Sequence, residues 1–259
     1  MSSLERRTAL LRARTRATVN TADRSWPGRL AGDLRELDAG WRESAEVCAD
    51  AAWTARATGH SVLGLLSPDR VTDGSLDPLT ARSLRHLYLS ALRYDFRCSS
   101  IQALVEQLPQ PARRDLDCYS RALYAFALLG RSRPEGLDLM DEVLDEAGTH
   151  AKTLHVLLHG LWLGQDLDQG ASRLLALSAR PPFDTGTDPI VLFRRAGALR
   201  RLGRYAEALA AIDTAMELLP PGDIGVHADL VRERSLITAV QDLHQHEHTR
   251  PCCAKGVSA

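Results

Sequence analysis

Three short segments of this chain each end an apolar, helix-like run with a glycine and begin another run after it. They read LLGRSRPEGL, WLGQDLDQGA and RLGRYAEALA, and they align on Gly130, Gly164 and Gly203, which lie 34 and then 39 residues apart. A glycine at this point favours a left-handed C-cap, after which the next helix can fold back antiparallel. One such hairpin cannot bury its apolar faces alone. The spacing therefore predicts helical hairpins that pack on their neighbours.

The rest of the chain follows the same pattern. Apolar residues recur at spacings of three and four, and alternating runs rich in Val, Ile and Thr are missing, so the prediction is an all-α protein. Clusters of Pro, Gly and Asp separate the segments. Four helix pairs are predicted: Leu79–Tyr94 with Ser99–Gln107, Ala112–Leu129 with Pro134–Glu146, His150–Leu163 with Leu167–Ala179, and Pro189–Leu202 with Tyr205–Leu219.

The remaining segments complete a four-part organisation. Residues 1–78 are predicted to form a less regular helical region, with helices at Ser3–Val19, Gly28–Ala39 and Trp41–Thr58, and residues 79–222 the hairpins. Residues 223–245 are predicted to form a capping helix, Ile224–His244, that covers the apolar face of the last hairpin. Residues 246–259 are predicted to be a flexible tail containing His and Cys.

The last pair resembles the tetratricopeptide repeat family. The resemblance rests on small residues, large apolar residues and a final proline in the expected order: Ala196, Leu199, Ala208, Ile212, Ala215 and Pro220. Leu192 and Arg195 depart from the family pattern, and Gly136 and Gly170 stand at the small position of the two preceding units. The resemblance implies a right-handed stack of antiparallel helical hairpins, a solenoid whose first helices line a concave surface.

Composition limits the classes of function. With 44% hydrophobic and 25% charged residues, the chain is predicted to be globular, and it contains no apolar run of 18 residues that could span a membrane. The net charge of −1 provides no general field for nucleic acid or anionic lipid. Lys152 and Lys255 are its only lysines, and this arginine-rich, alanine-rich composition is typical of actinobacterial coding sequence.

The expected location is the cytoplasm. Arg6 and Arg7 form a twin arginine, but further arginines interrupt the apolar stretch that an export signal needs. The five cysteines show no disulfide-like spacing, so reduced thiols are expected.

Histidines provide the main alternative, a metal-dependent protein or enzyme. His155 and His159 lie one helical turn apart, as helical zinc ligands do, but HVLLHG lacks the glutamate of a metalloprotease motif and no third ligand is identifiable. The tail offers a second weak donor set: His244, His246, His248, Cys252 and Cys253.

Other catalytic patterns are weaker. Asp184 begins an Asp-Thr-Gly triplet, as in aspartic proteases, but it lies in a loop between helices, where Asp188 is a candidate N-cap. The chain shows no glycine-rich phosphate loop and no Ser-His-Asp ordering. The prediction is therefore a non-enzyme that needs no cofactor.

If the resemblance holds, the variable positions of the first helices form a partner-binding groove. Arginines beside aromatic residues there suit a protein partner or an acidic or C-terminal peptide segment. An equal alternative is that Arg200 and Arg201 are solvated residues stabilised by the helix dipole. The groove residues are Asp117, Ser120 and Tyr124, then His155, Leu158 and Trp162, then Phe193, Arg194, Gly197, Arg200 and Arg201.

The favoured function is a non-catalytic scaffold or adaptor that binds a protein or peptide. A regulatory protein related to the repeat domains of actinobacterial transcriptional activators is the second hypothesis, although no DNA-reading helix-turn-helix is recognisable and nucleic acid is not an expected partner. No membrane partner is expected, and self-association into a homo-oligomer is left open.

Overall fold

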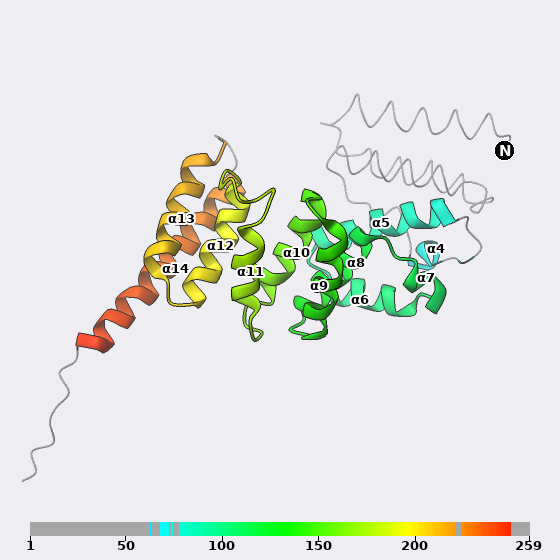
Figure 1. Cartoon of the computed structure of the whole chain (residues 1–259), viewed down its shortest axis with the longest axis horizontal. Coiled ribbons are helices and arrows are strands. Elements are labelled where there is room, and N and C mark those ends of the chain that lie inside the picture. The colour runs from blue at the N-terminus through cyan, green and yellow to red at the C-terminus, as the bar shows by residue number, and fades with distance from the viewer. Residues whose placement is uncertain (1–62, 64–67, 73, 75–77, 221–223, 250–259) are drawn as a thin grey trace, which may run out of the picture.

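The described residues are helical throughout, as the sequence predicts. The computed structural model describes residues 63, 68–72, 74, 78–220 and 224–249, apart from the side chains of 70, 79, 80, 83 and 244–249, and within this part the chain has no strand. The helices follow one another in an elongated row, from α4–α7 at one end to α14 at the other (Figure 1). The predicted helices within residues 1–62 lie outside the described residues.

Eleven helices are present in the described part of the chain. They are α4 Pro68–Val71, α5 Pro78–Tyr94, α6 Cys98–Gln107, α7 Gln110–Arg114, α8 Cys118–Leu129, α9 Glu135–Ala147, α10 Ala151–Leu163, α11 Gly170–Ser178, α12 Pro189–Arg201, α13 Tyr205–Leu218 and α14 Ile224–Thr249.

Consecutive helices pack in pairs. Helix α8 contacts α9, α10 contacts α11, and α12 contacts α13. The first members of these pairs also contact one another, α8 with α10 and α10 with α12, and α14 then packs on both α12 and α13. Each helix therefore buries one side within its pair and another side against the next pair.

The buried apolar side chains form two clusters that meet at α12. The larger cluster runs from α4 to α12 and is centred on the fully buried Phe126. The smaller one joins α12, α13 and α14 through Leu199, Ile212 and Ile237. Val191 and Ala198 of α12 belong to the larger cluster, so this helix presents different sides to the two cores.

One predicted helix, Ala112–Leu129, is in fact two. Helix α7 ends at Arg114, and α8 begins after Asp117, whose side chain accepts a hydrogen bond from the Ser120 N–H at 3.0 Å. Asp117 is thus an N-cap, which favours a fresh helix start over continuation through residues 115–117.

Three turns share one geometry, in which a left-handed residue follows the helix. The next residue donates its N–H to the carbonyl five positions earlier, at 2.9 Å in each case: Arg97 to Leu92, Arg133 to Leu128 and Arg204 to Leu199. The left-handed residues are Phe96, Ser132 and Gly203, with φ of 55°, 54° and 73°. This is the Schellman C-cap. The prediction is confirmed at Gly203 and wrong at Gly130 and Gly164, whose φ values are −65° and −92°.

Gly130 and Gly164 are needed for space instead. A Cβ on Gly130 would lie 2.7 Å from the Sγ of Cys98, and one on Gly164 would lie 3.2 Å from the carbonyl oxygen of Leu129. Gly160, inside α10, is more constrained, since its Cβ would lie 2.9 Å from the backbone Cα of Phe126. Helices α8 and α10 therefore touch nearly backbone to backbone at this point.

The start of α12 follows the sequence prediction. Asp188 is its N-cap and accepts hydrogen bonds from the N–H groups of Ile190 and Val191 at 2.8 and 3.1 Å. The pKa of Asp188 lies below its usual range, first because its carboxylate accepts a hydrogen bond from His155 and also because of these backbone donors, although burial acts in the opposite direction. The cap is confirmed and joins α12 to α10.

Helix α14 is longer than predicted. It extends to Thr249 rather than ending at His244, so the segment beyond residue 245 begins as helix rather than as a tail. No glycine or proline interrupts residues 226–249. Pro251 is the next proline in the sequence, and a proline disfavours the helical conformation of the residue before it. Within the described ranges, no helix combines the length and apolarity needed to cross a bilayer.

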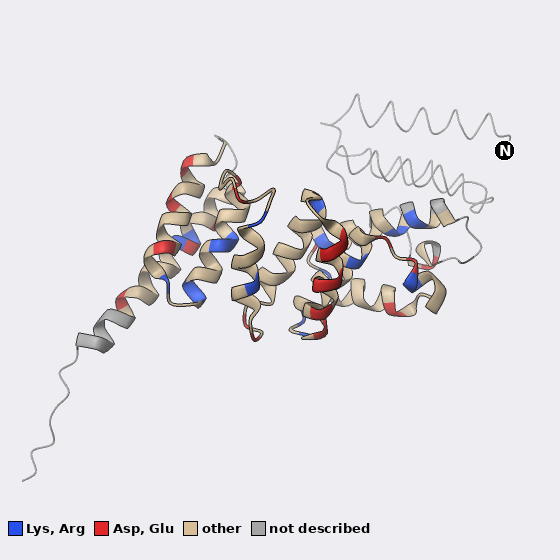
Figure 2. Cartoon of the chain, in the orientation of Figure 1, with Lys and Arg blue, Asp and Glu red and all other residues tan. Residues whose placement is uncertain are grey.

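Although the net charge is small, acidic and basic residues are unevenly distributed along the row of helices. Acidic residues gather on α9, where Asp141 pairs with Arg173 at 2.6 Å, and Figure 2 shows this helix as the most acidic stretch in view. Helix α12 carries four arginines and no acidic residue: Arg194, Arg195, Arg200 and Arg201. Arginine is therefore concentrated on α12, although Arg200 and Arg201 pair with Glu233 and Asp166.

We expect Gly160→Ala to lower the free energy of unfolding by up to about 2 kcal/mol, because overpacking costs about 1–3 kcal/mol and the gain in helix propensity returns only about 1 kcal/mol. The matched control is Gly225→Ala in α14, where a Cβ meets nothing within 4 Å and the same gain should leave stability unchanged or raised. Chemical denaturation measures both variants. Equal effects of the two would contradict backbone-to-backbone packing of α8 and α10.

We expect Asp188→Asn to lower stability by about 1 kcal/mol near neutral pH, because it keeps a capping oxygen but loses the charge-assisted bond to His155. Folding lowers the Asp188 pKa, so the contribution is complete above the unfolded pKa of about 3.9 and is lost as pH falls through the folded value. The difference between wild type and variant in urea unfolding should therefore shrink towards about pH 3. A difference that grows in acid would exclude this role.

Candidate functional site

A pocket of about 430 Å³ lies where α12 faces α10 and α14. Helix α10 supplies His159 and Trp162, and the turn between α5 and α6 supplies Phe96. The other lining residues come from α12 and α14: Ile190, Phe193, Arg194 and Arg200, then Val226, Asp229, Arg232, Glu233 and Leu236. We call this the inter-helix pocket, and its volume is in the range typical of ligand sites.

Aromatic rings form a row along the pocket. The centroid of the Phe96 ring lies 5.3 Å from that of His159, His159 lies 6.0 Å from Trp162, and Trp162 lies 5.6 Å from Phe193. These separations are those of interacting aromatic pairs. Trp162 and Phe193 are partly exposed, and Phe96 is 58% exposed, so the row presents apolar area to a ligand.

Gly197 provides the room for Trp162. A Cβ at Gly197 would lie 3.1 Å from the indole nitrogen of Trp162, so the ring rests directly on the backbone of α12. The glycine therefore acts through the position of the tryptophan rather than by offering a side chain of its own.

A buried arginine stands at the centre of the lining. Arg194 is only 8% exposed, and its Nη1 donates to the carbonyl oxygen of His155 at 3.4 Å. Burial, reinforced by repulsion from Arg93, lowers the pKa of Arg194 to about 9. Arg194 therefore remains a cation at neutral pH, although it is largely removed from water.

His159 is the neutral neighbour of this cation. Burial, together with repulsion from Arg194 and Arg93, lowers its pKa to about 2. Its Nδ1 lies 3.4 Å from the Arg93 guanidinium, and its ring also packs on Phe126. His159 therefore serves as a neutral hydrogen-bonding and aromatic wall rather than as a proton acceptor in neutral solution.

Two further arginines, Arg200 and Arg232, line the pocket, and Arg200 is already neutralised. The Nε of Arg200 donates to Oε1 of Glu233 at 2.7 Å, and Glu233 is itself buried. This pair links α12 to α14, so the helix predicted as a cap also forms one wall of the pocket.

The predicted groove residues separate into two sets. Four of them line the inter-helix pocket: Trp162, Phe193, Arg194 and Arg200. Arg201 lies outside its lining and pairs with Asp166 at 2.7 Å, and the ring of His155 bonds Asp188 at 3.1 Å and contacts Phe183 edge-on. Leu158 is fully buried, so it belongs to the core rather than to an accessible surface.

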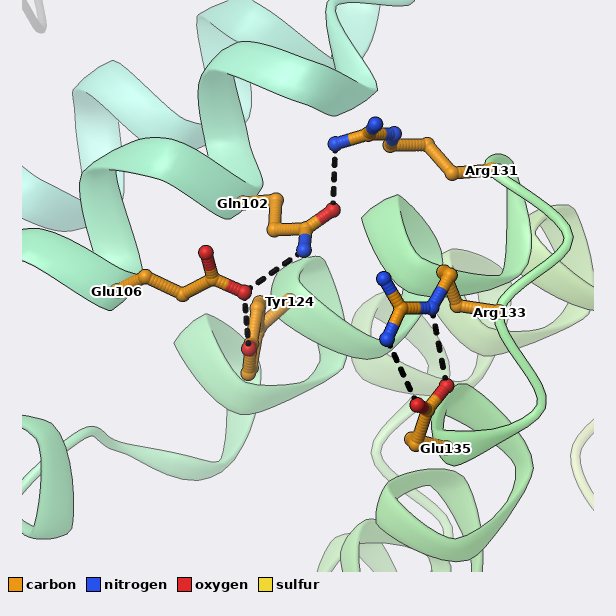
Figure 3. A network of polar contacts seen from close by, with 6 residues as sticks. All are labelled: Gln102, Glu106, Tyr124, Arg131, Arg133 and Glu135. Atoms are coloured by element: carbon orange, nitrogen blue, oxygen red, sulfur yellow. Dashed lines mark hydrogen bonds and ion pairs between the residues drawn. The ribbon is translucent and has the colours of Figure 1, made fainter.

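The predicted residues of α8 lie elsewhere. Asp117 caps the helix, and Ser120 is buried with its hydroxyl donating to Asp117 at 2.8 Å. Tyr124 donates to Glu106 of α6 at 3.3 Å, within the network that also holds Gln102 and Arg131 (Figure 3). In the same view Arg133 pairs with Glu135 at the start of α9. These contacts tie α6 to α8 and do not reach the inter-helix pocket.

The metal candidates are also dispersed. His155 faces Asp188, whereas His159 faces the aromatic row, and no group of three or more His, Cys, Asp or Glu suited to a metal occurs among the described residues. The side chains of His244, His246 and His248, like Cys252 and Cys253, lie outside the description.

Sequence reasoning missed Phe96 and the α14 wall. Phe96 lies in the RYDFRCSS turn, where no periodic signal marks a side chain that will reach α10. Its one distinguishing feature is a bulky residue at the left-handed position of a Schellman turn, where glycine is usual.

Comparisons with models of known protein families, with curated proteins and with solved structures find no significant match to this chain. Any functional assignment therefore rests on the packing of the helices and on the geometry of the pocket.

Proposed function

We propose that this chain is a non-catalytic binding module, similar to tetratricopeptide repeat proteins, that docks a partner protein or peptide segment along α10, α12 and α14. The observation that carries the proposal is the row of partly exposed aromatic side chains beside an arginine-rich helix. Aromatic residues and arginine are the types that contribute most to protein interfaces.

The packing of the helices supports the family resemblance. The pairs α8–α9, α10–α11 and α12–α13 succeed one another, and the first helices of the pairs contact each other in sequence. This is the arrangement expected of stacked hairpins whose first helices line one surface. Two of these hairpins, α8–α9 and α12–α13, reverse through the same Schellman turn, which also follows α5, whereas the α10–α11 turn does not use it.

The side chains favour binding over acid–base chemistry. The low pKa of His159 removes it as a proton acceptor near neutral pH, and His155 and Glu233 are held by Asp188 and Arg200. Arg200 and Arg201 of α12 are already paired with Glu233 and Asp166, so the preference for acidic partners rests on Arg194 and Arg195.

The test begins with a displayed library of random peptides, from which those that bind the wild-type protein are selected. We expect the selected sequences to be rich in acidic and apolar residues, and Trp162→Ala and Phe193→Ala each to weaken their binding at least about tenfold, because truncating a central aromatic anchor costs about 2 kcal/mol. Fluorescence anisotropy measures the affinities.

Leu218→Ala is the matched control, because Leu218 is an exposed apolar residue at the end of α13 and does not line the pocket. Its affinity for the same peptides should stay within about twofold of wild type. Failure to select any peptide, or equal losses in Leu218→Ala and the two aromatic variants, would rule out docking on this surface.

A further inference from the structure

Arg194 has an unusual balance of charge and burial. A guanidinium carries five N–H donors, and the hydrogen bond described for Arg194 uses Nη1 to reach a backbone carbonyl at 3.4 Å. Among the described residues, no carboxylate forms an ion pair with it. Burying a cation is costly unless an anion compensates, so this side chain is suited to receive one.

Two neighbouring carboxylates, those of Asp188 and Glu233, are committed elsewhere. One oxygen of Asp188 accepts from the N–H groups of Ile190 and Val191, and the other bonds His155 at 3.1 Å. Glu233 bonds Arg200 at 2.7 Å. Asp229 lies on the α14 side of the lining without an ion pair to Arg194 in the described structure. Arg232 of α14 also lines the pocket, so three arginines face two lining carboxylates, Asp229 and Glu233, and one positive charge is not cancelled by the pocket's own acids.

Size and lining limit what the anion can be. A volume of about 430 Å³ fits a small organic molecule, and Trp162 and Phe193 supply flat apolar walls beside the guanidinium. Inorganic phosphate or sulfate would satisfy the charge but leave these walls unused. A carboxylate attached to a compact aromatic or branched apolar group uses both, because a guanidinium binds carboxylate in bidentate fashion.

Phe96 gives a second, independent indication. Its backbone is left-handed, at φ 55°, where a bulky side chain is rare and energetically costly, while the residue is 58% exposed and so gains little from burial. Ser132 occupies the equivalent position of the α8–α9 turn and does not line the pocket. The strain at Phe96 places an aromatic ring at the pocket where stability alone favours glycine.

We propose that the inter-helix pocket binds a small free organic acid, with its carboxylate on Arg194 and its apolar body between Trp162, Phe193 and Phe96. This goes beyond the docking of a partner segment and makes the chain a receptor for a small anion as well. Since both ligands would use Trp162 and Phe193, an occupied pocket excludes a segment docked on the same side chains.

The direct test is isothermal titration of the full chain with 3-phenylpropanoate, indole-3-acetate and 4-methylpentanoate. We expect at least one acid to bind with a Kd below about 1 mM, which is a reasonable affinity for so small a ligand. The corresponding uncharged amide should bind at least tenfold more weakly. No binding by any of the three acids, or equal binding of acid and amide, overturns the proposal.

Two variants assign the contacts. Arg194→Met removes the charge with an unbranched apolar side chain and should weaken the acid at least tenfold without lowering the melting temperature, because the unpaired cation does not stabilise the fold. Phe96→Gly should weaken the acid severalfold while raising the melting temperature. Ser132→Gly is its matched control and should raise the melting temperature with unchanged affinity. Unchanged affinity in both Arg194→Met and Phe96→Gly overturns the proposal.

A peptide that ends in phenylalanine, with a blocked amino terminus and a free terminal carboxylate, distinguishes a site for free acids from a site for chain termini. Binding of this peptide in an Arg194-dependent manner, with none of the free acids bound, shows a site for chain ends and overturns the small-acid proposal. Selected library peptides that still require Trp162 and Phe193 would then leave the docking function standing, so the two proposals can fail separately.

Discussion

The close approach of α8 and α10 is the constraint on which the rest of the arrangement depends. At Gly160 the two helices meet with no side chain between them, since a Cβ there would lie 2.9 Å from the Cα of Phe126. This contact sets the positions of Phe126 and of His159, one residue before Gly160, whose ring centroids are 5.0 Å apart. His159 in turn faces Phe96 and Trp162, so the close approach at Gly160 is connected to the aromatic row of the inter-helix pocket through one residue.

The electrostatics of the pocket follow from the same packing. Arg194 is one turn from the Asp188–Val191 cap and is covered by α10, and the carboxylate that would most readily neutralise it is already held by His155 and by backbone donors. Arg93 reaches the same region from α5, at 3.4 Å from His159. Helix packing thus buries Arg194 and His159 and brings Arg93 close to them, and burial first, with this repulsion second, lowers the pKa of both groups.

Local signals in the sequence predicted helices well and sites only in part. Asp188 with Pro189, and Gly203 before α13, mark helix ends through residues adjacent in the chain, so the bounds of α12 and α13 differ from expectation by a residue at most. Gly130 and Gly164 looked like the same signal but serve interhelical contacts, which depend on residues far away in sequence.

The rotation of each helix about its axis explains why only some of the predicted groove residues line the inter-helix pocket. Trp162 lies at the pocket and Leu158 in the core, although both were assigned to one face of α10, because residues four apart are about 40° from perfect alignment. Phe96 and the α14 wall come from other parts of the chain, and no periodicity in α12 indicates them. Such partners become visible only when the tertiary arrangement is known.

Phe96 shows how function and stability diverge at one position. The three Schellman turns hold the same backbone geometry with phenylalanine, serine and glycine, so the turn itself does not require an aromatic residue. Glycine at Gly203 satisfies the conformation without strain, whereas phenylalanine must be held there by its surroundings. Phe96 is largely exposed and gains little from burial to offset this cost. Its ring instead lies beside His159 and lines the same pocket as Arg194. Backbone strain that is not offset by burial of the side chain is the pattern expected where a residue binds a ligand rather than stabilising the fold.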